Sequence, residues 1–484
     1  MFSHVRHTGS YRQRAIAGAR PPQVPGAAAS PSAAPLRRLR MRSLVGGLAA
    51  LVLAVAGVLA AAVPSTASEQ EQSYIVVLKD SVADPGAAAA AQQGSYGLAV
   101  STVYRSAVNG YAATMTPSAA ARLAADPGVD FVTAAREFQQ PKDPKPSTQV
   151  APDWWQRMGG TPGDRTHHGA DNAVDVNVAV IDSGIDATHP DLNVRGGIDC
   201  STGSPVKVTP TDKVGHGTFV AGVIGAKDNH QGVIGAAPGT PLWSVRVVND
   251  NEMITEEMLI CAIDWVTSTR KDADPDNDIE VANISIGGRG ADTPDCGKGT
   301  DPMHYAICRS VKAGVAYAVA AGNSGEDIAN FVPATYDEVL TATAMADFDG
   351  KRGGLASPIC GAEDWSTVGQ LDDQPAFFSN FASRSKDEAH TIAGPGFCVA
   401  STSPEPAGYA VGHGTSFASP AVAGSLALCI SDGECEGSGK ALMSQFLDIT
   451  AAYNAQHRSF GFDGDPFRPL DGKYYGYLAQ IAAY

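Results

Sequence analysis

The sequence GHGTSFASP occupies residues 412–420, and an apolar run compatible with a helix follows at 421–428. The two glycines let the backbone approach a ligand closely. We expect Pro420 in the first turn of the helix, where its missing N–H costs little. The stretch therefore predicts a tight turn that places Ser416 at the N-terminus of a buried helix.

A serine in this position has two possible roles. The free N–H groups and the positive end of the helix dipole would stabilise negative charge that develops beside Ser416. A serine hydroxyl is nevertheless a weak nucleophile until a base removes its proton. Ser416 is therefore either a nucleophile with a base elsewhere in the chain or a capping serine on a core helix.

Length and charge limit the class of protein. The chain has 484 residues, 44% of them hydrophobic, and a formal net charge of −16. This length exceeds the usual range of one domain and predicts two or more folded units. Residues 1–42 hold eight Arg and no Asp or Glu, so the remainder is more acidic than the whole chain. Such a surface argues against nucleic acid or anionic membranes as partners.

All eight cysteines lie after residue 199. An even number without zinc-like spacing suits a disulfide-bonded extracellular domain. Many connectivities are possible. Pairing near neighbours first predicts four bridges: Cys296–Cys308, Cys429–Cys435, Cys360–Cys398 and Cys200–Cys261.

The N-terminal region carries a targeting pattern. An uninterrupted apolar run at 44–63 follows four arginines and precedes small residues. This pattern is typical of a secretory signal peptide, here about 41–67, cleaved near Ala67. The run is also long enough to span a membrane, so membrane retention is the alternative. Met41 is an alternative start to Met1, and residues 1–67 form the leader and signal peptide.

Residues 68–138 predict a small α+β unit with the order strand, helix, strand, strand, helix, strand. The expected elements are 73–79, 85–93, 100–104, 110–115, 117–126 and 129–133. The proline-rich residues 139–150 form a linker and a domain boundary.

A large unit follows at 151–484, where short apolar runs alternate with helical segments. Strands are expected at 176–181, 242–247, 281–286, 315–320 and 338–344, and helices at 218–226, 256–268 and 303–313. This alternation predicts an α/β fold, a parallel sheet with helices on both faces. In such sheets, functional residues collect at the carboxyl ends of the strands.

Two polar residues follow predicted strands. Asp182 ends the strand at 176–181, and because an unpaired buried charge is costly, it needs a partner. Asn323 follows the strand at 315–320, where its amide is placed to donate to an oxyanion, a contribution typically worth ~3 kcal/mol. The alternative for Asn323 is a turn-forming residue, common before Ser-Gly.

The tetrapeptide GHGT occurs twice, at 215–218 and again just before Ser416. Histidine is the usual general base near neutral pH. His413 stands three residues before Ser416, but a base must approach the hydroxyl from outside the nucleophile's own turn. His216, on a separate element, can meet Asp182 and Ser416 together. We therefore choose His216 as the base, with His413 lining the site.

Four motifs then appear in one order: DSG at 182–184, GHGT at 215–218, AAGN at 320–323 and GTSFASP at 414–420. In this order they resemble the subtilisin family of serine proteases, the subtilases, over roughly residues 150–455. The resemblance implies four roles: Asp182 as orienting carboxylate, His216 as base, Ser416 as nucleophile and Asn323 as oxyanion donor. Residues 73–138 resemble the subtilase propeptide, an intramolecular chaperone and temporary inhibitor, which implies a zymogen cut near 138–149.

The resemblance also implies substrate and metal sites. The walls of the S1 pocket would be small or apolar: Ser285, Ile286, Gly287, Ala320, Ala321 and Gly322. None is a carboxylate, so we expect large apolar or aromatic P1 residues. Substrate would add as a β-strand along 251–254, which lacks the glycines often seen there. Asp191 and Asn229 keep the spacing of a structural calcium site, and the alternative is an acidic loop without metal.

We therefore predict a secreted, self-processing serine endopeptidase that needs no cofactor for catalysis and acts as a monomer on proteins or peptides. Its own residues 68–138 would inhibit it until they are released. One alternative is a dedicated processing protease with a narrow substrate, held in a membrane by 44–63. Another is a catalytically dead scaffold, against which the intact set of four residues argues.

Overall fold

The computed structural model describes residues 70–138, 152–161, 174–229, 231–354, 356–357, 360, 369–404 and 408–484. The predicted leader, signal peptide and proline-rich linker lie outside the described residues. Within the described ranges, no helix has the length and apolar character needed to cross a bilayer.

Residues 70–138 form a four-stranded antiparallel sheet with two helices, in the predicted order. The elements are β1 (Gln72–Leu78), α1 (Pro85–Tyr96), β2 (Ala99–Tyr104), β3 (Gly110–Met115), α2 (Pro117–Leu123) and β4 (Val129–Ala134). Successive side chains of a strand point to opposite faces. Accordingly Val76 packs toward α1 and α2, whereas Ile75 and Val77 join the core of the large unit.

The large unit is built on an eight-stranded sheet with the order β15-β14-β12-β10-β6-β8-β7, and β16 pairs with β14. Its strands are β6 (Asn177–Asp182), β7 (Val194–Asp199), β8 (Leu242–Arg246), β10 (Ile279–Ile284), β12 (Ala316–Ala320), β14 (Leu340–Ala346), β15 (Gln374–Pro375) and β16 (Thr391–Phe397). Every pairing is parallel except that of β14 with β15. The predicted α/β class is confirmed.

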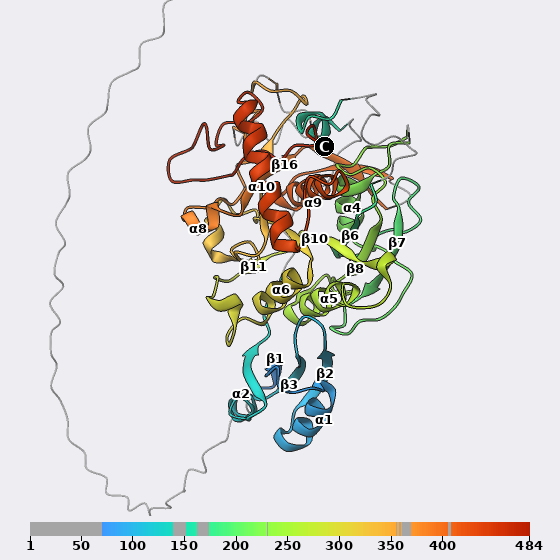
Figure 1. Ribbon diagram of the computed structural model, residues 1–484, viewed down its shortest axis with the longest axis vertical. Coiled ribbons are helices and arrows are strands. Elements are labelled where there is room, and N and C mark those ends of the chain that lie inside the picture. The colour runs from blue at the N-terminus through green and yellow to red at the C-terminus, as the bar shows by residue number, and fades with distance from the viewer. Residues whose placement is uncertain are drawn as a thin grey trace, which may run out of the picture. The chain divides into compact units, whose positions relative to one another are not determined.

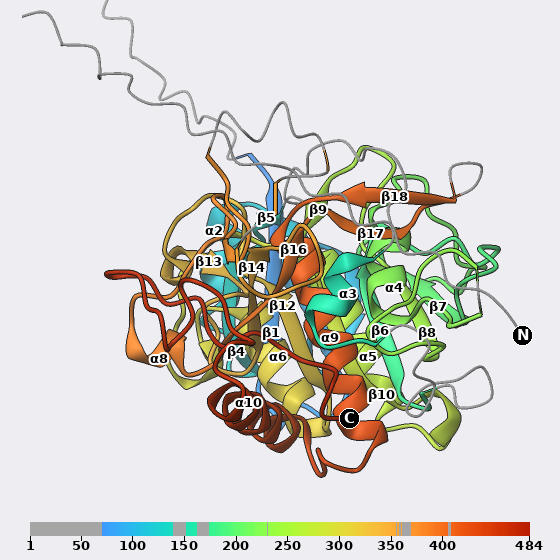
Figure 2. The same ribbon diagram turned by 90° about the horizontal axis from the view of Figure 1, so that it is seen from above.

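Helices cover both faces of this sheet. The helices described in the large unit are α3 (Asp153–Arg157), α4 (His216–Gly225), α5 (Glu256–Thr269), α6 (Pro302–Ala313), α8 (Ser385–Glu388), α9 (Thr415–Ser431) and α10 (Gly439–Gln456). Figure 1 shows α4 and α9 on one side of the strands, with α5 and α6 on the other. The hairpin of β17 (Val399–Thr402) and β18 (Tyr409–Gly412) packs on α4 (Figure 2).

The position of Pro420 corrects one expectation. Helix α9 already begins at Thr415, so Pro420 lies inside the helix and not in its first turn. A proline there leaves the carbonyl four residues earlier, that of Ser416, without its helical N–H donor. The hydroxyl of Ser285 donates to this carbonyl at 2.7 Å and replaces the missing bond.

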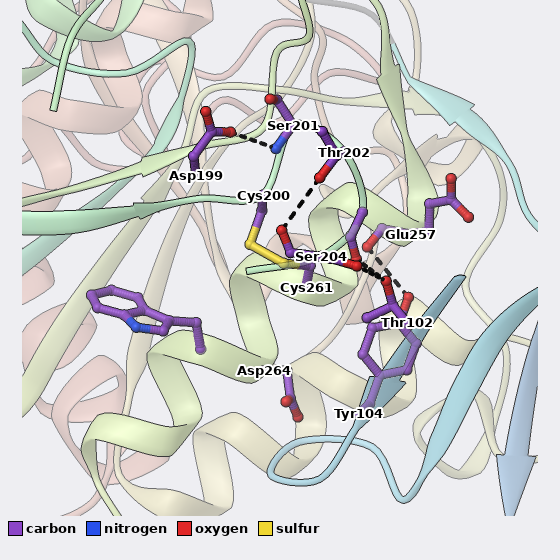
Figure 3. The surroundings of a disulfide bond; sticks show 12 residues. Thr102, Tyr104, Asp199, Cys200, Ser201, Thr202, Ser204, Glu257, Cys261 and Asp264 are labelled. Carbon is purple, nitrogen blue, oxygen red and sulfur yellow. Dashed lines mark hydrogen bonds between the residues drawn. A yellow bond between two sulfur atoms is a disulfide. The ribbon is translucent and has the colours of Figure 1, made fainter. Parts of the chain in front are cut away.

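Four disulfides join all the cysteines in the predicted pairing: Cys200–Cys261, Cys296–Cys308, Cys360–Cys398 and Cys429–Cys435. The first ties the turn after β7 to α5, directly beside β2 of the small unit (Figure 3). There the hydroxyl of Thr102 donates to the carbonyl of Gly203 at 2.6 Å. This disulfide therefore stiffens the surface against which residues 70–138 pack.

Candidate active site

The candidate site lies where the order of strands in the sheet reverses. In the sheet, β8 and β7 lie on one side of β6, and the later strands β10, β12 and β14 lie on the other. The carboxyl ends of β6 and β10 are neighbours, and such switch points are the usual ligand sites of open parallel sheets. Asp182 ends β6, and Ser285 follows directly after β10.

Asp182 and His216 form a close pair at this edge. Nδ1 of His216, the first residue of α4, lies 2.8 Å from Oδ1 and 3.0 Å from Oδ2 of Asp182. The carboxylate is fully buried, and the N–H of Ser183 donates to its Oδ1 at 2.7 Å. A Cβ on Gly217 would lie 2.0 Å from the carbonyl oxygen of Gly184, so only glycine lets the start of α4 lie this close to the loop after β6. The carboxylate thus orients the ring with Nε2 on its opposite side.

Ser416 is the second residue of α9 and is fully buried. Its hydroxyl donates to the carbonyl of Ser285 at 3.4 Å, at the end of β10. The ring of Phe417 lies beside that of His216, with centroids 5.6 Å apart. The N-cap of α9 is Gly414 without a side-chain cap, so Ser416 does not cap its helix. Ser416 and His216 therefore reach the same edge of the sheet from two helices.

Asn323 lies in the turn after β12, next to this serine. Its Oδ1 accepts hydrogen bonds from the N–H of Thr415 at 2.9 Å and from the Thr415 hydroxyl at 2.8 Å. Both bonds hold the carboxamide oxygen against the start of α9. The NH₂ group, on the other side of the same carboxamide, remains as a donor for a ligand beside Ser416.

His413 packs against Phe397 and Cys398. The N–H of Cys398 donates to its Nδ1 at 2.9 Å, and its ring lies 4.6 Å from that of Phe397. Burial lowers the pKa of His413 to about 4, so the ring is neutral at physiological pH. A neutral imidazole fixed in this way serves packing, in agreement with the choice of His216.

The six predicted pocket residues follow two neighbouring strands. Residues 285–287 leave β10 and residues 320–322 end and follow β12, and these strands pair in parallel. All except the two glycines are buried. The sequence Asn283-Ile284-Ser285 matches the pattern of an N-glycosylation site, but Asn283 lies inside β10, is fully buried and bonds to the hydroxyls of Ser285 and Ser419.

Asp191 and Asn229, the predicted calcium ligands, are adjacent and joined by a hydrogen bond. The amide nitrogen of Asn229 donates to Asp191 Oδ1 at 2.9 Å, and the N–H of Val233 donates to Oδ2 at 3.2 Å. The hydroxyl of Tyr409 also donates to Oδ2, at 3.3 Å. Calcium requires a cage of several more oxygen atoms than these two side chains supply, so the calcium site stays a prediction.

The end of the small unit adds a strand beside the site. Its β5 (Glu137–Phe138) pairs antiparallel with β9 (Ile254–Thr255), and β5 also contacts β11 (Gly288–Arg289). Substrate was expected to bind along residues 251–254. Strand β9 overlaps this segment at Ile254 and extends one residue beyond it. An extended peptide can add to a sheet edge in this way whatever its sequence, because the bonds are made by the backbone.

A second contact of the small unit was not anticipated from the sequence. Asp264 on α5 accepts from the N–H groups of Ser106 at 2.8 Å and Ala107 at 2.5 Å. Burial raises the pKa of Asp264, and these backbone bonds oppose the rise. In the sequence Asp264 is one acid among several on a predicted helix. Only the tertiary structure shows that it faces a loop more than a hundred residues earlier.

Comparison with known proteins agrees with this geometry and defines a class. The model of the Subtilase family matches residues 174–462, and the model of Peptidase inhibitor I9 matches residues 73–139. The chain belongs to the subtilase family and is a subtilisin-type serine peptidase with an inhibitor-type propeptide domain.

Particular relatives extend the comparison. Subtilisin NAT of Bacillus subtilis subsp. natto is 31% identical over 331 residues, which cover 67% of this chain and 71% of the relative. Subtilisin Savinase of Lederbergia lenta is 34% identical over 253 residues, 52% of this chain and 75% of the relative. Fervidolysin from Fervidobacterium pennivorans shares the fold, with a TM-score of 0.60 at 20% identity over 86% of this chain and 61% of that one.

Proposed function

We propose that this chain is a secreted serine endopeptidase made as a self-processing zymogen. The observation that carries the proposal is the convergence of Asp182, His216 and Ser416 at the switch point of the sheet. In the proposed reaction, the Ser416 oxygen attacks a peptide carbonyl carbon while Nε2 of His216 takes the hydroxyl proton. Asp182 stabilises the imidazolium that forms.

The tetrahedral intermediate carries its negative charge on the former carbonyl oxygen. The NH₂ group of Asn323 and the N–H of Ser416 at the start of α9 would donate to this oxygen. His216 then returns the proton to the leaving amine, and the C–N bond breaks. Water hydrolyses the acyl-enzyme by the same steps and regenerates Ser416.

In this proposal residues 1–67 direct secretion, 68–138 act as chaperone and inhibitor, 139–150 link the units and 151–484 are the peptidase. The pairing of β5 with β9 supports inhibition, because the small unit then occupies the edge that substrate would use. The small and apolar residues after β10 and β12 favour large apolar or aromatic P1 side chains. The mature enzyme would act as a monomer, without a catalytic cofactor.

The proposal is tested by mass spectrometry after treatment with a fluorophosphonate serine probe. We expect one adduct, on Ser416, in a chain that starts between about residues 138 and 151. The Ser416→Ala variant should take no label and should keep its propeptide when no other protease is present, whereas Ser431→Ala at the exposed end of α9 should behave as wild type. Normal processing of Ser416→Ala under those conditions would contradict self-cleavage.

The alternatives give different outcomes. A correctly trimmed chain that takes no label would be a scaffold matured by another protease. Recovery in a membrane fraction of an active chain that still carries residues 44–63, together with cleavage of very few peptides from a library, would favour the narrow processing protease.

A further inference from the structure

One side chain of the small unit is enclosed by the large unit close to the β5–β9 pair. The guanidinium of Arg136 donates from Nε and Nη2 to Glu256 Oε1, at 3.0 and 2.6 Å. Nη2 also donates to Asp301 Oδ1 at 2.7 Å and to the hydroxyl of Tyr336 at 3.2 Å. We call the four residues around this guanidinium the Arg136 pocket: Glu256, Asp301, Tyr336 and Gly290.

The pocket is buried and belongs to the peptidase part of the chain. The Glu256 and Asp301 side chains are 0% and 4% exposed, and Tyr336 is fully buried. Tyr336 donates to Asp301 Oδ2 at 2.8 Å, which fixes its hydroxyl. A Cβ on Gly290 would lie 2.7 Å from the side chain of Val332 and 3.1 Å from Nη1 of Arg136, so the glycine leaves space for both. The pocket is therefore shaped by residues that remain after the propeptide is cut away.

The backbone of Arg136 continues the antiparallel pairing of β5. Its N–H donates to Glu256 Oε2 at 2.8 Å, and its carbonyl accepts from the Glu256 N–H at 2.7 Å. Arg136 thus occupies the position two residues before Phe138, which pairs with Ile254. Because backbone pairing at a sheet edge does not depend on sequence, side-chain pockets along the edge set specificity. The Arg136 pocket is such a pocket.

Release of the propeptide would leave Glu256 and Asp301, two carboxylates that Arg136 now helps to bury, without the cation that lies between them. Burial raises the pKa of Glu256, and the charge of Arg136 opposes the rise. Removing one partner of a buried ion pair is strongly unfavourable. The vacated pocket should therefore favour a new cation of the same shape. An arginine fits better than a lysine, since only the planar guanidinium can contact both carboxylates and the tyrosine from several donors.

We infer that the Arg136 pocket is a substrate subsite that selects an arginine upstream of the scissile bond, two residues before the substrate residue that pairs with Ile254. The propeptide fills this subsite with Arg136 until it is released. This inference rests on the proposed peptidase function and adds the class of substrate: extended peptides with an upstream arginine and an apolar P1 residue. The alternative is that the pocket serves only to anchor the propeptide.

The test uses the mature enzyme and quenched-fluorescence peptides with a constant apolar P1 residue. A single arginine is moved through the upstream positions, and at each position it is compared with citrulline, which has nearly the same shape without the charge. We expect one position at which arginine raises kcat/KM about 10- to 100-fold over citrulline, as a charge-assisted contact should. Lysine should fall between the two.

Protein variants locate the effect. Glu256→Gln should reduce the arginine-to-citrulline ratio at that position to near one, and Asp301→Asn should reduce it partly. Glu257→Gln, the same change at the next residue of α5, should keep the wild-type ratio. The comparison within wild-type enzyme needs no variant, so it decides the question even where Glu256→Gln fails to fold.

Two results would overturn the inference, and they are distinguishable. If peptides are hydrolysed and no upstream position prefers arginine to citrulline, the pocket is only a propeptide anchor. If no peptide is hydrolysed and Ser416 takes no fluorophosphonate label, the proposed function itself fails.

Discussion

The side-chain oxygen of Asn323 accepts two hydrogen bonds from Thr415, the residue directly before Ser416. The carboxamide is thereby oriented from the start of α9, and its NH₂ group is the only part left to meet a ligand. A donor held in place in this way needs no reorganisation when negative charge develops, which is the condition for strong electrostatic stabilisation.

Asn323→Leu should therefore lower kcat by about 10²–10³-fold with little change in KM, a magnitude known for this donor in subtilisin. Thr415→Val keeps the backbone bond to Asn323 but loses the hydroxyl bond to Asn323 and the bond that the hydroxyl accepts from the N–H of Gly322 at 3.0 Å, so we expect a smaller loss of about tenfold. Steady-state kinetics on one peptide substrate would measure both. An Asn323→Leu enzyme with nearly unchanged kcat would show that the amide does not contact the oxyanion.

Asp264 should control how tightly the propeptide is held. It accepts several backbone N–H bonds from residues 105–107, and charge-assisted bonds of this kind contribute about 1.5–3 kcal/mol each. Asp264→Asn should therefore release the cut propeptide about 10- to 100-fold faster and shorten the delay before activity appears. Asp448→Asn, an exposed change on α10, is the matched control. An unchanged delay in Asp264→Asn would assign propeptide binding to other contacts.

The four disulfides should differ in their contributions to stability. Cys200–Cys261 closes a separation of 61 residues and Cys429–Cys435 one of 6. The loop-entropy relation then gives about 4 and about 2 kcal/mol. Alanine pairs at each bridge, in the Ser416→Ala background to prevent autolysis, should lower the free energy of unfolding in urea in that order. Equal losses would mean that native packing, not loop entropy, sets the contributions.

Asp347 should make stability depend on pH. Burial raises its pKa to about 8, although Arg157 opposes the rise, with Nε 3.8 Å from Asp347 Oδ1. The unfolded carboxyl titrates near 4, so between about pH 4 and pH 8 the folded state binds more protons and this group costs stability as pH rises. Asp347→Asn should remove that cost.

Thermal unfolding at several pH values checks this sign. The Tm of Asp347→Asn relative to the parent should be nearly unchanged near pH 4 and should increase steadily toward pH 8. Asp448→Asn, which changes an exposed carboxylate, should show no such trend. A Tm difference for Asp347→Asn that is constant with pH would mean that this carboxyl does not titrate in that range.

Much of the fold could be predicted from the sequence because its strands are short apolar runs between helical segments. The predicted strand at 242–247 is Leu242–Arg246, and the predicted helix at 256–268 is Glu256–Thr269. Ser416 was predicted at the N-terminus of a helix, and it is the second residue of α9, but the N-cap glycine carries no capping side chain that would mark the exact start. Hence Pro420 was expected too early in the helix.

The sequence by itself determined the family and the order of the two folded units, and it predicted the four site residues Asp182, His216, Asn323 and Ser416. These follow from local motifs, in which small residues and strand ends restrict the chemistry available to each side chain. The tertiary structure decided which distant groups meet: Asp264 with residues 105–107, and Arg136 with Glu256, Asp301 and Tyr336. Such contacts join residues more than a hundred positions apart, and no periodicity or spacing along one chain records them. Only the packing of the small unit on α5 and α6 brings those charges together.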